Sequence, residues 1–354
     1  MPTMARRTGL GRRVDDLVDA CLVTNPVNLR YLTGFTGSNG AVLVRADGSA
    51  VLATDGRYAE QAAGESPDVE ILVTRDIAGE LVRRAADDGV GRLAIQHRHV
   101  TLTAATRLVE AAGNVELVDL GGAVESLRAV KDDEELEALR RACAITDEVF
   151  AAIVELLAPG MTEREVSWLM REQMHARGAA PAFESIVAFG ANSARPHHAP
   201  TDRALERGEL VKMDFGARVD GYHADMTRTV VVGEAAAWQQ EVHGLVQQIQ
   251  ATCRQEVRPG AVPAELDALA RKLVEESGND VAHGLGHGVG LEIHEAPFLV
   301  DQSPADTLVE RVPVTVEPGI YLPGRGGVRI EDTVVVTAEG SEPLTRSPRE
   351  LLVI

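Results

Sequence analysis

The chain has 354 residues, of which 45% are hydrophobic and 25% are charged, a composition typical of a globular protein of about two domains at roughly 150 residues each. Its 35 basic and 54 acidic residues give a net charge of −19, which would repel nucleic acid and anionic membranes. No apolar run approaches the ~18 residues that a membrane helix needs, so we expect neither nucleic acid nor a membrane as a partner.

The N-terminus and the cysteines favour a cytoplasmic protein. Basic residues near the start could pass for a signal peptide, but aspartates follow where its apolar stretch should begin. The three cysteines, Cys21, Cys143 and Cys253, are far apart and outside any C-x-x-C pair, so neither a disulfide framework nor a thiolate zinc site is expected. The N-terminal residues in question are Arg6, Arg7, Arg12 and Arg13, followed by Asp15, Asp16 and Asp19.

The first third of the chain alternates short apolar runs with amphipathic stretches, which predicts an α/β domain. Two of the runs, 41–44 and 50–53, flank Asp47-Gly48, a pair that favours a β-hairpin turn. Helices are expected around Leu81 and Leu108. Further strands are predicted at 69–73, 93–96 and 115–120.

A long amphipathic helix is predicted to open the second part of the chain. Asp132 is expected to be its N-cap, with Glu135 completing a capping box. Apolar residues then recur at helical spacing as far as Leu156, before Pro159-Gly160 ends the helix. We place the domain boundary near Leu127, which divides the chain into domains 1–127 and 128–354.

The second part contains an internal repeat with an offset of 100 residues. Pro159-Gly160 and Pro259-Gly260 are each followed, five residues later, by an acidic and an aliphatic residue and then by a predicted helix. A strand-rich segment follows each helix, so we expect two similar halves packed together. The alternative is that Pro-Gly pairs simply separate helices here.

Asp220-Gly221 predicts a β-hairpin between the runs 210–219 and 222–232. If Val219 pairs with Tyr222, Asp214 lies opposite Thr227 and Asp225 shares its face, at ~7–8 Å between Cα atoms. Two acids on a buried face repel each other unless a cation neutralises them. The hairpin therefore indicates a metal site, although Asp225 could instead pair with a neighbouring arginine or cap a turn.

Histidines gather in two short segments. His283, His287 and His294 lie among alternating glycines, which let backbone or substrate approach closely. The spacing fits neither a nucleotide-binding loop nor a zincin helix. A further pair, His197 and His198, follows a proline, so a functional cluster is favoured over isolated core histidines.

Two glutamates near the C-terminus complete a symmetric set of acids. Glu317 ends a predicted strand at 312–317, and Glu331 lies in another at 328–336. In the second half they occupy the places that Asp214 and Asp225 occupy in the first. Two Asp, two Glu and one or two His suit a pair of divalent ions, with manganese or cobalt favoured by the oxygen-rich set.

These motifs resemble the metallopeptidases of the pita-bread fold, in particular the branch of Xaa-Pro dipeptidases (prolidases) and Xaa-Pro aminopeptidases, over nearly the whole chain. The resemblance rests on 214–216, 221–229, the Gly-His-Gly around His287, the Glu-Pro-Gly from Glu317 and the Arg-Ile-Glu-Asp from Arg329. It implies an α+β fold. A pita-bread catalytic domain of two similar halves would follow a smaller α/β creatinase/prolidase-like N-terminal domain, whose signature lies at 25–35.

The resemblance also implies a dinuclear metal centre. The family's ligand positions would hold two divalent ions per chain, with a bridging hydroxide between them. Manganese is the first expectation for these ions, with cobalt and zinc as alternatives. The ligand positions are Asp214, Asp225, His287, Glu317 and Glu331.

Other residues are given catalytic roles by the resemblance alone. Glu317 would act as general base on the attacking water. His197 and His294 would stabilise the oxyanion or protonate the leaving prolyl nitrogen. His283 and Arg329 would complete the active site.

The implied activity is hydrolysis of the Xaa-Pro bond in dipeptides or at the N-terminus of peptides, by a homodimer acting on proline-containing substrates. The sequence does not separate dipeptidase from aminopeptidase, and it assigns no role to His198 or His223. Two other functions remain open: a non-catalytic pita-bread binding protein and a metal-free, creatinase-like hydrolase. Both would be marked by lost ligands, and none of the ligand positions is lost.

Overall fold

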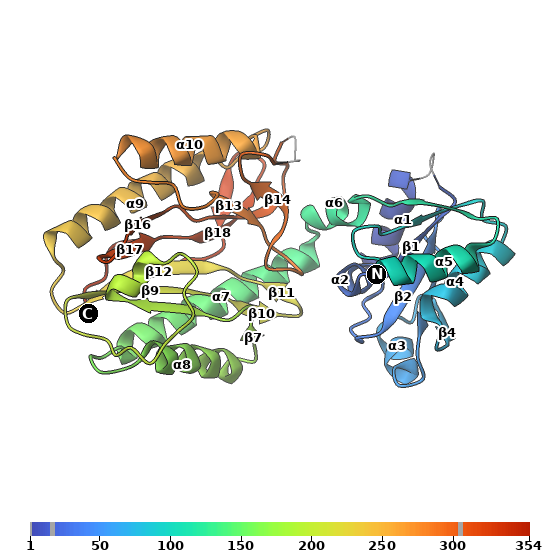
Figure 1. Ribbon diagram of the computed structural model, residues 1–354, viewed down its shortest axis with the longest axis horizontal. Helices are drawn as coiled ribbons and strands as arrows, with labels where there is room; N and C mark the ends of the chain where they lie inside the picture. Colours follow the sequence, from blue (N-terminus) through green and yellow to red (C-terminus); the bar gives the residue numbers. More distant parts are fainter. Residues whose placement is uncertain (1, 15–17, 304–306) are drawn as a thin grey trace. The chain divides into compact units, whose positions relative to one another are not determined.

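The computed structural model describes residues 2–14, 18–303 and 307–354. The chain divides into two compact units, Met1–Arg128 and Ala129–Ile354 (Figure 1). Asp15 and Asp16, which entered the argument against a signal peptide, lie outside the described residues. Among the described helices, none combines the length and apolar composition that crossing a bilayer requires.

The first unit is built on a six-stranded mixed sheet in the order β4-β3-β2-β1-β5-β6. Its α/β character was predicted, and the Asp47-Gly48 turn joins β2 to β3 with Gly48 at a φ of 86°. The strands are β1 (Ala20–Val23), β2 (Gly40–Arg45), β3 (Ala50–Thr54), β4 (Glu70–Val73), β5 (Arg92–Ile95) and β6 (Glu116–Asp119). The helices are α1 (Pro2–Val14), α2 (Pro26–Thr33), α3 (Ala59–Glu65), α4 (Ile77–Asp87), α5 (Leu102–Ala112) and α6 (Ala123–Ala129).

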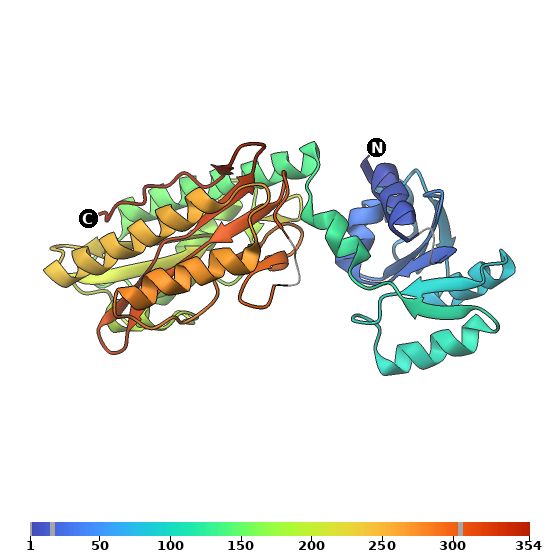
Figure 2. The same ribbon diagram turned by 90° about the horizontal axis from the view of Figure 1, so that it is seen from above.

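The second unit contains two pairs of helices with strands between them. Figure 1 shows α9 and α10 above the strands and α7 and α8 below, and Figure 2 shows α9 and α10 from above, lying over the strands. The helices are α7 (Asp133–Leu156), α8 (Glu163–Ala176), α9 (Ala237–Glu256) and α10 (Pro263–Glu276), with a 3-10 turn at Gly190–Ala194. The strands are β7 (Ala180–Pro181), β8 (Ile186–Phe189), β9 (Glu209–Phe215), β10 (Ala217–Val219), β11 (Tyr222–His223), β12 (Met226–Val232), β13 (Gly286–Gly288), β14 (Glu295–Leu299), β15 (Pro313–Val316), β16 (Gly319–Leu322), β17 (Gly326–Arg329), β18 (Asp332–Val336) and β19 (Ser341–Pro343).

The predicted two-half organisation is confirmed. Helices α8 and α10 begin and end 100 residues apart, and one hydrophobic core packs against α7 and α8 while another packs against α9 and α10. Helix α7 begins with the expected capping box, because the Asp132 carboxylate accepts from the Glu135 N–H while the Glu135 side chain accepts from the Asp132 N–H. Burial of one face of each helix therefore builds two similar layers around the central strands.

The hairpin around Asp220-Gly221 has the predicted register, but each of its two predicted strands is divided into two shorter ones. Val219 pairs with Tyr222 and Asp214 with Thr227. The runs 210–219 and 222–232 are each interrupted, so that β9 and β12 lie in one sheet and β10 and β11 in another. At the interruption, a Cβ on Gly216 would lie 1.7 Å from the carbonyl oxygen of Ala224, and this close approach requires glycine.

The expected single strand at 328–336 is wrong in the same way. It is divided into β17 and β18, which belong to different sheets, with Glu331 between them. The cause is a hydrogen bond between the halves, because the Glu331 N–H donates to the carbonyl oxygen of Thr227 (3.1 Å) and not to a ladder partner. The strand ends at this point, and the carboxylate is left at the centre of the unit.

Candidate metal centre

The predicted ligands lie in strands or directly beside them, and they all line one cavity. Asp214 lies near the end of β9, Asp225 directly before β12, His287 in β13, Glu317 directly after β15 and Glu331 directly before β18. The cavity has a volume of about 830 Å³. Four of the ligand positions are buried and Glu317 is half-buried, so the candidate ligands form the floor of the cavity.

Three of these side chains form a tight cluster. The ligand atoms of Asp225, His287 and Glu331 all lie within 4.8 Å of one another. The Nε2 atom of His287 is also 3.4 Å from Oε1 of Glu317. Asp214 lies beside the cluster and accepts a hydrogen bond from Nη2 of Arg329. The structure thus brings together all the residues proposed as ligands.

Two oxygen atoms of this cluster have no hydrogen-bond partner in the part of the chain that the structure describes. Oδ1 of Asp225 and Oε1 of Glu331 are buried, and neither has a hydrogen bond within the described residues. Buried acceptors are nearly always satisfied, so an exception calls for a missing partner such as an ion. His287 supplies a matching nitrogen, because its Nδ1 lies 3.0 Å from the carbonyl oxygen of Gly288, which leaves the Nε2 lone pair facing the carboxylates. This donor set, rich in carboxylate oxygens with one imidazole nitrogen, fits divalent metal ions.

The protonation of the cluster also favours a cation. Burial, together with the charges of neighbouring carboxylates, raises the pKa of Asp225 and of Glu331 well above the ordinary range. Burial raises the pKa of Glu317 to about 7, with Arg329 opposing the increase. Burial lowers the pKa of His287 to about 4, so its imidazole is neutral near pH 7. Divalent ions would replace protons on these carboxylates.

Threonines that the sequence interpretation did not single out orient the ligands. The Thr227 hydroxyl donates to Oε2 of Glu331 (2.7 Å) and accepts from Nε of Arg329 (3.0 Å). The Thr315 hydroxyl accepts from the N–H of His287 (3.0 Å) and donates to Oε1 of Glu317 (3.3 Å). Each threonine is two residues from a ligand position, so strand periodicity could have pointed to it.

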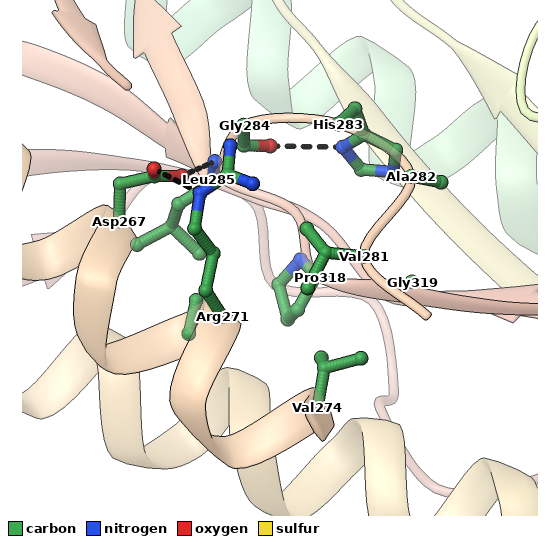
Figure 3. Close-up of a pocket in the computed structure, with 11 residues that line it drawn as sticks. Asp267, Arg271, Val274, Val281, Ala282, His283, Gly284, Leu285, Pro318 and Gly319 are labelled. Atoms are coloured by element: carbon green, nitrogen blue, oxygen red, sulfur yellow. Dashed lines mark hydrogen bonds and ion pairs between the residues drawn. The ribbon is translucent and has the colours of Figure 1, made fainter. Parts of the chain in front are cut away.

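His283 is held in a chain of hydrogen bonds and does not point freely into the cavity. Nη1 of Arg329 donates to the Tyr321 hydroxyl (2.8 Å), which in turn lies 2.8 Å from Nε2 of His283. The Nδ1 atom of His283 lies 2.8 Å from the carbonyl oxygen of Gly284, as Figure 3 shows from the side of a small pocket beside α10. Burial and Arg329 lower the pKa of His283 to about 4. Tyr321, missed in the sequence, connects Arg329 to this imidazole.

His197 and His294 line the same cavity nearer its mouth. Both are exposed, in contrast to the ligand cluster. The rings of His294 and His287 meet edge to face with centroids 4.3 Å apart. Burial and the neighbouring His197 lower the pKa of His294. These two imidazoles are therefore available to a bound substrate.

The two histidines without a sequence-based role are both tied to the protein. Nε2 of His198 lies 2.8 Å from a carboxylate oxygen of the fully buried Glu163. Glu163 also accepts hydrogen bonds from Thr201. Nδ1 of His223 lies 2.9 Å from the carbonyl oxygen of Gly290, and His223 does not line the cavity. Both histidines hold loops around the site.

Known proteins resemble the chain over both units. The model of metallopeptidase family M24 matches residues 137–338, and that of the creatinase/prolidase N-terminal domain matches residues 13–130. The Xaa-Pro dipeptidase of Pyrococcus furiosus is 35% identical over 96% of each chain. Among solved structures, a Xaa-Pro dipeptidase from Bacillus anthracis has a TM-score of 0.94 and 37% identity, covering 99% of this chain and 100% of its own. An X-Pro aminopeptidase from Thermotoga maritima MSB8 has a TM-score of 0.89 and 35% identity, covering 97% and 100%.

Proposed function

The chain belongs to metallopeptidase family M24 and carries a creatinase/prolidase N-terminal domain, and we propose that this metallopeptidase hydrolyses the Xaa-Pro bond of dipeptides or of peptides that begin with Xaa-Pro. The observation that carries the proposal is the buried cluster of carboxylates around one imidazole, in which two oxygens lack a hydrogen-bond partner among the described residues. The Xaa-Pro dipeptidase and X-Pro aminopeptidase among its relatives support the substrate class.

The proposed cofactor is a pair of divalent ions per chain, with manganese as the first expectation. Bound at this site, such ions would lower the pKa of a water molecule toward ~7 and polarise the substrate carbonyl. The residues proposed to hold them are Asp214, Asp225, His287, Glu317 and Glu331. These five residues also distinguish the proposed enzyme from a metal-free hydrolase, which would not require a set of metal ligands.

The remaining chemistry is proposed for the chain's own side chains. Glu317 takes a proton from the attacking water, a role open to a carboxylate that lines the cavity. His197 and His294, at the mouth of the cavity, stabilise the oxyanion and deliver a proton to the prolyl nitrogen. That nitrogen belongs to a tertiary amide and must be protonated to leave. Arg329 orients Asp214, and His283 acts through its bond to Tyr321.

We also propose a division of labour between the domains. Residues 128–354 carry the chemistry, and residues 1–127 contribute to homodimer assembly and restrict the length of the substrate. The three cysteines are free and buried, which supports a reducing compartment such as the cytosol.

The experiment measures bound metal and product together. Purified protein is reconstituted with Mn²⁺, and cleavage of Xaa-Pro dipeptides is compared with cleavage of Xaa-Pro-Yaa tripeptides. About two ions per chain and Xaa-Pro cleavage that a chelator abolishes are expected. Cleavage that persists without metal would refute the proposed mechanism, and binding of metal without Xaa-Pro cleavage would refute the substrate class.

A further inference from the structure

A lysine lies buried beneath the cavity wall. On β9, the odd-numbered residues Val211 and Met213 pack in the core against α7 and α8. Lys212 points to the opposite face, together with Leu210, which packs in the core of the other half. Lys212 has 0% exposure, although lysine is almost never fully buried unless its amine is paired.

The amine of Lys212 binds the backbone that leads into His197. Its Nζ lies 2.5 Å from the carbonyl oxygen of Arg195 and 3.3 Å from that of Pro196. Nη1 of Arg329 donates to the same Pro196 oxygen at 3.3 Å. Two side chains from beneath thus hold two consecutive peptide groups. An amine can serve both carbonyls whether it is charged or neutral, because it keeps at least two N–H bonds.

The loop is held on both sides of this contact. Before it, the Ser193 hydroxyl oxygen accepts from the N–H of Gly327 (2.8 Å). After it, Glu163 binds His198 and Thr201. His197 itself is exposed, so its direction depends on the peptide groups that precede it. Lys212 is not among the residues that line the cavity, so it does not itself touch a substrate bound there.

We propose that Lys212 is a positioning residue that fixes the Arg195 and Pro196 carbonyls, so that the His197 imidazole is directed into the cavity. The inference rests on the proposed function, in which His197 acts on the substrate. An apolar residue would fill the space on β9 without the cost of burying an amine. The position of the amine under two carbonyl oxygens accounts for that cost.

The test is a double-mutant cycle on the metal-loaded, full-length protein. Lys212→Met keeps the length and apolar stem but removes the donor. We expect kcat to fall by ~10-fold or more, because small misplacements of a catalytic group can cost up to 10²-fold. KM and bound metal should stay within about 2-fold. In a His197→Ala background, the same substitution should change kcat by less than about 2-fold.

Gln239→Met is the matched control. Gln239 is buried and donates from Nε2 to the carbonyl oxygen of Gly208 (2.8 Å), away from the cavity lining. Its loss should lower stability and leave kcat and KM unchanged. Lys212→Gln retains an amide donor and should lie between wild type and Lys212→Met, and it replaces Lys212→Met in the cycle if the latter does not fold.

Hydrogen exchange of the segment 195–201 gives a readout that does not depend on activity. We expect exchange there to rise several-fold in Lys212→Met and not in Gln239→Met. Additive effects of Lys212→Met and His197→Ala on kcat, or unchanged exchange, would overturn the role of Lys212. Absence of Xaa-Pro cleavage by the wild type would refute the proposed function instead, and the exchange comparison would still decide whether Lys212 orders the loop.

Discussion

Replacing Glu317 by glutamine in the metal-free protein should stabilise the catalytic unit at pH 8 and hardly at all at pH 5. Burial raises the pKa of Glu317 from 4.5 to about 7 in the folded chain. The native state therefore keeps a proton that the unfolded state has released, so stability falls as pH rises between these two values. Glutamine has the shape of the protonated acid and does not titrate.

The expected magnitude follows from the two pKa values. From 4.5 to about 7, at about 1.4 kcal/mol for each pH unit, the carboxylate loses about 3 kcal/mol of stability relative to glutamine. Titrating groups away from Glu317 are common to both proteins and cancel in the difference, whereas the loss of the Glu317 charge also eases deprotonation of Asp225 and Glu331. Divalent ions should reverse the order, because they bind the carboxylate of the wild type and stabilise the native state that holds them.

The assay is urea unfolding of both proteins in chelator at pH 5, 6, 7 and 8, followed by tryptophan fluorescence. The chain has two tryptophans, Trp168 on α8 and Trp238 on α9, so the signal reports on the unit that contains the site. If the stability difference between wild type and Glu317→Gln is equal at pH 5 and pH 8, the pKa of Glu317 is not raised by folding. The inference that this buried cluster binds either protons or divalent ions would then be refuted.

Three further predictions concern single residues. Asp225→Asn or Glu331→Gln should abolish turnover and lower bound metal with little change in the circular dichroism spectrum; activity above a few per cent with full metal content would contradict the ligand assignment. His294→Ala should lower kcat by ~10²–10⁴-fold with metal retained, whereas His287→Ala should lose metal; the reverse pattern would mean that their roles are exchanged. Thr227→Val should weaken metal binding by ~10–100-fold, the usual effect of removing a group that orients a ligand, and titration calorimetry showing wild-type affinity would refute it.

The parts of the fold that the sequence predicts well are set by local chemistry. The hairpin register follows from Asp220-Gly221, which adopts φ values of 49° and 84°, as a two-residue primed turn requires. The start of α7 follows from the capping box at Asp132. The 100-residue repeat can be detected by comparing one part of the sequence with another. None of these predictions depends on knowing which segments meet in space.

The parts that the sequence does not predict depend on long-range partners. An apolar run such as 328–336 indicates strand but does not indicate which sheet each end joins, so the break at Glu331 could not be foreseen. In the sequence, Lys212 looks like a solvent-facing polar residue of a strand with alternating polar and apolar positions. Its role depends on the carbonyl oxygens of Arg195 and Pro196, which only the fold brings to its amine. Tyr321 is an ordinary strand residue until Arg329 is placed beside it.

The hydrogen bonds at the strand breaks explain why the proposed ligands lie where the two halves meet. The Glu331 N–H donates to the carbonyl oxygen of Thr227, whose hydroxyl donates back to the Glu331 carboxylate. The Thr333 hydroxyl, from the second half, donates to the carbonyl oxygen of Asp225, from the first (2.8 Å). Glu331 is thus held through its carboxylate by a threonine of the first half, and Asp225 is held through its backbone by a threonine of the second half. Both halves therefore contribute to the arrangement of the proposed site. Divalent ions that bind only the assembled cluster would therefore stabilise the packing of one half against the other.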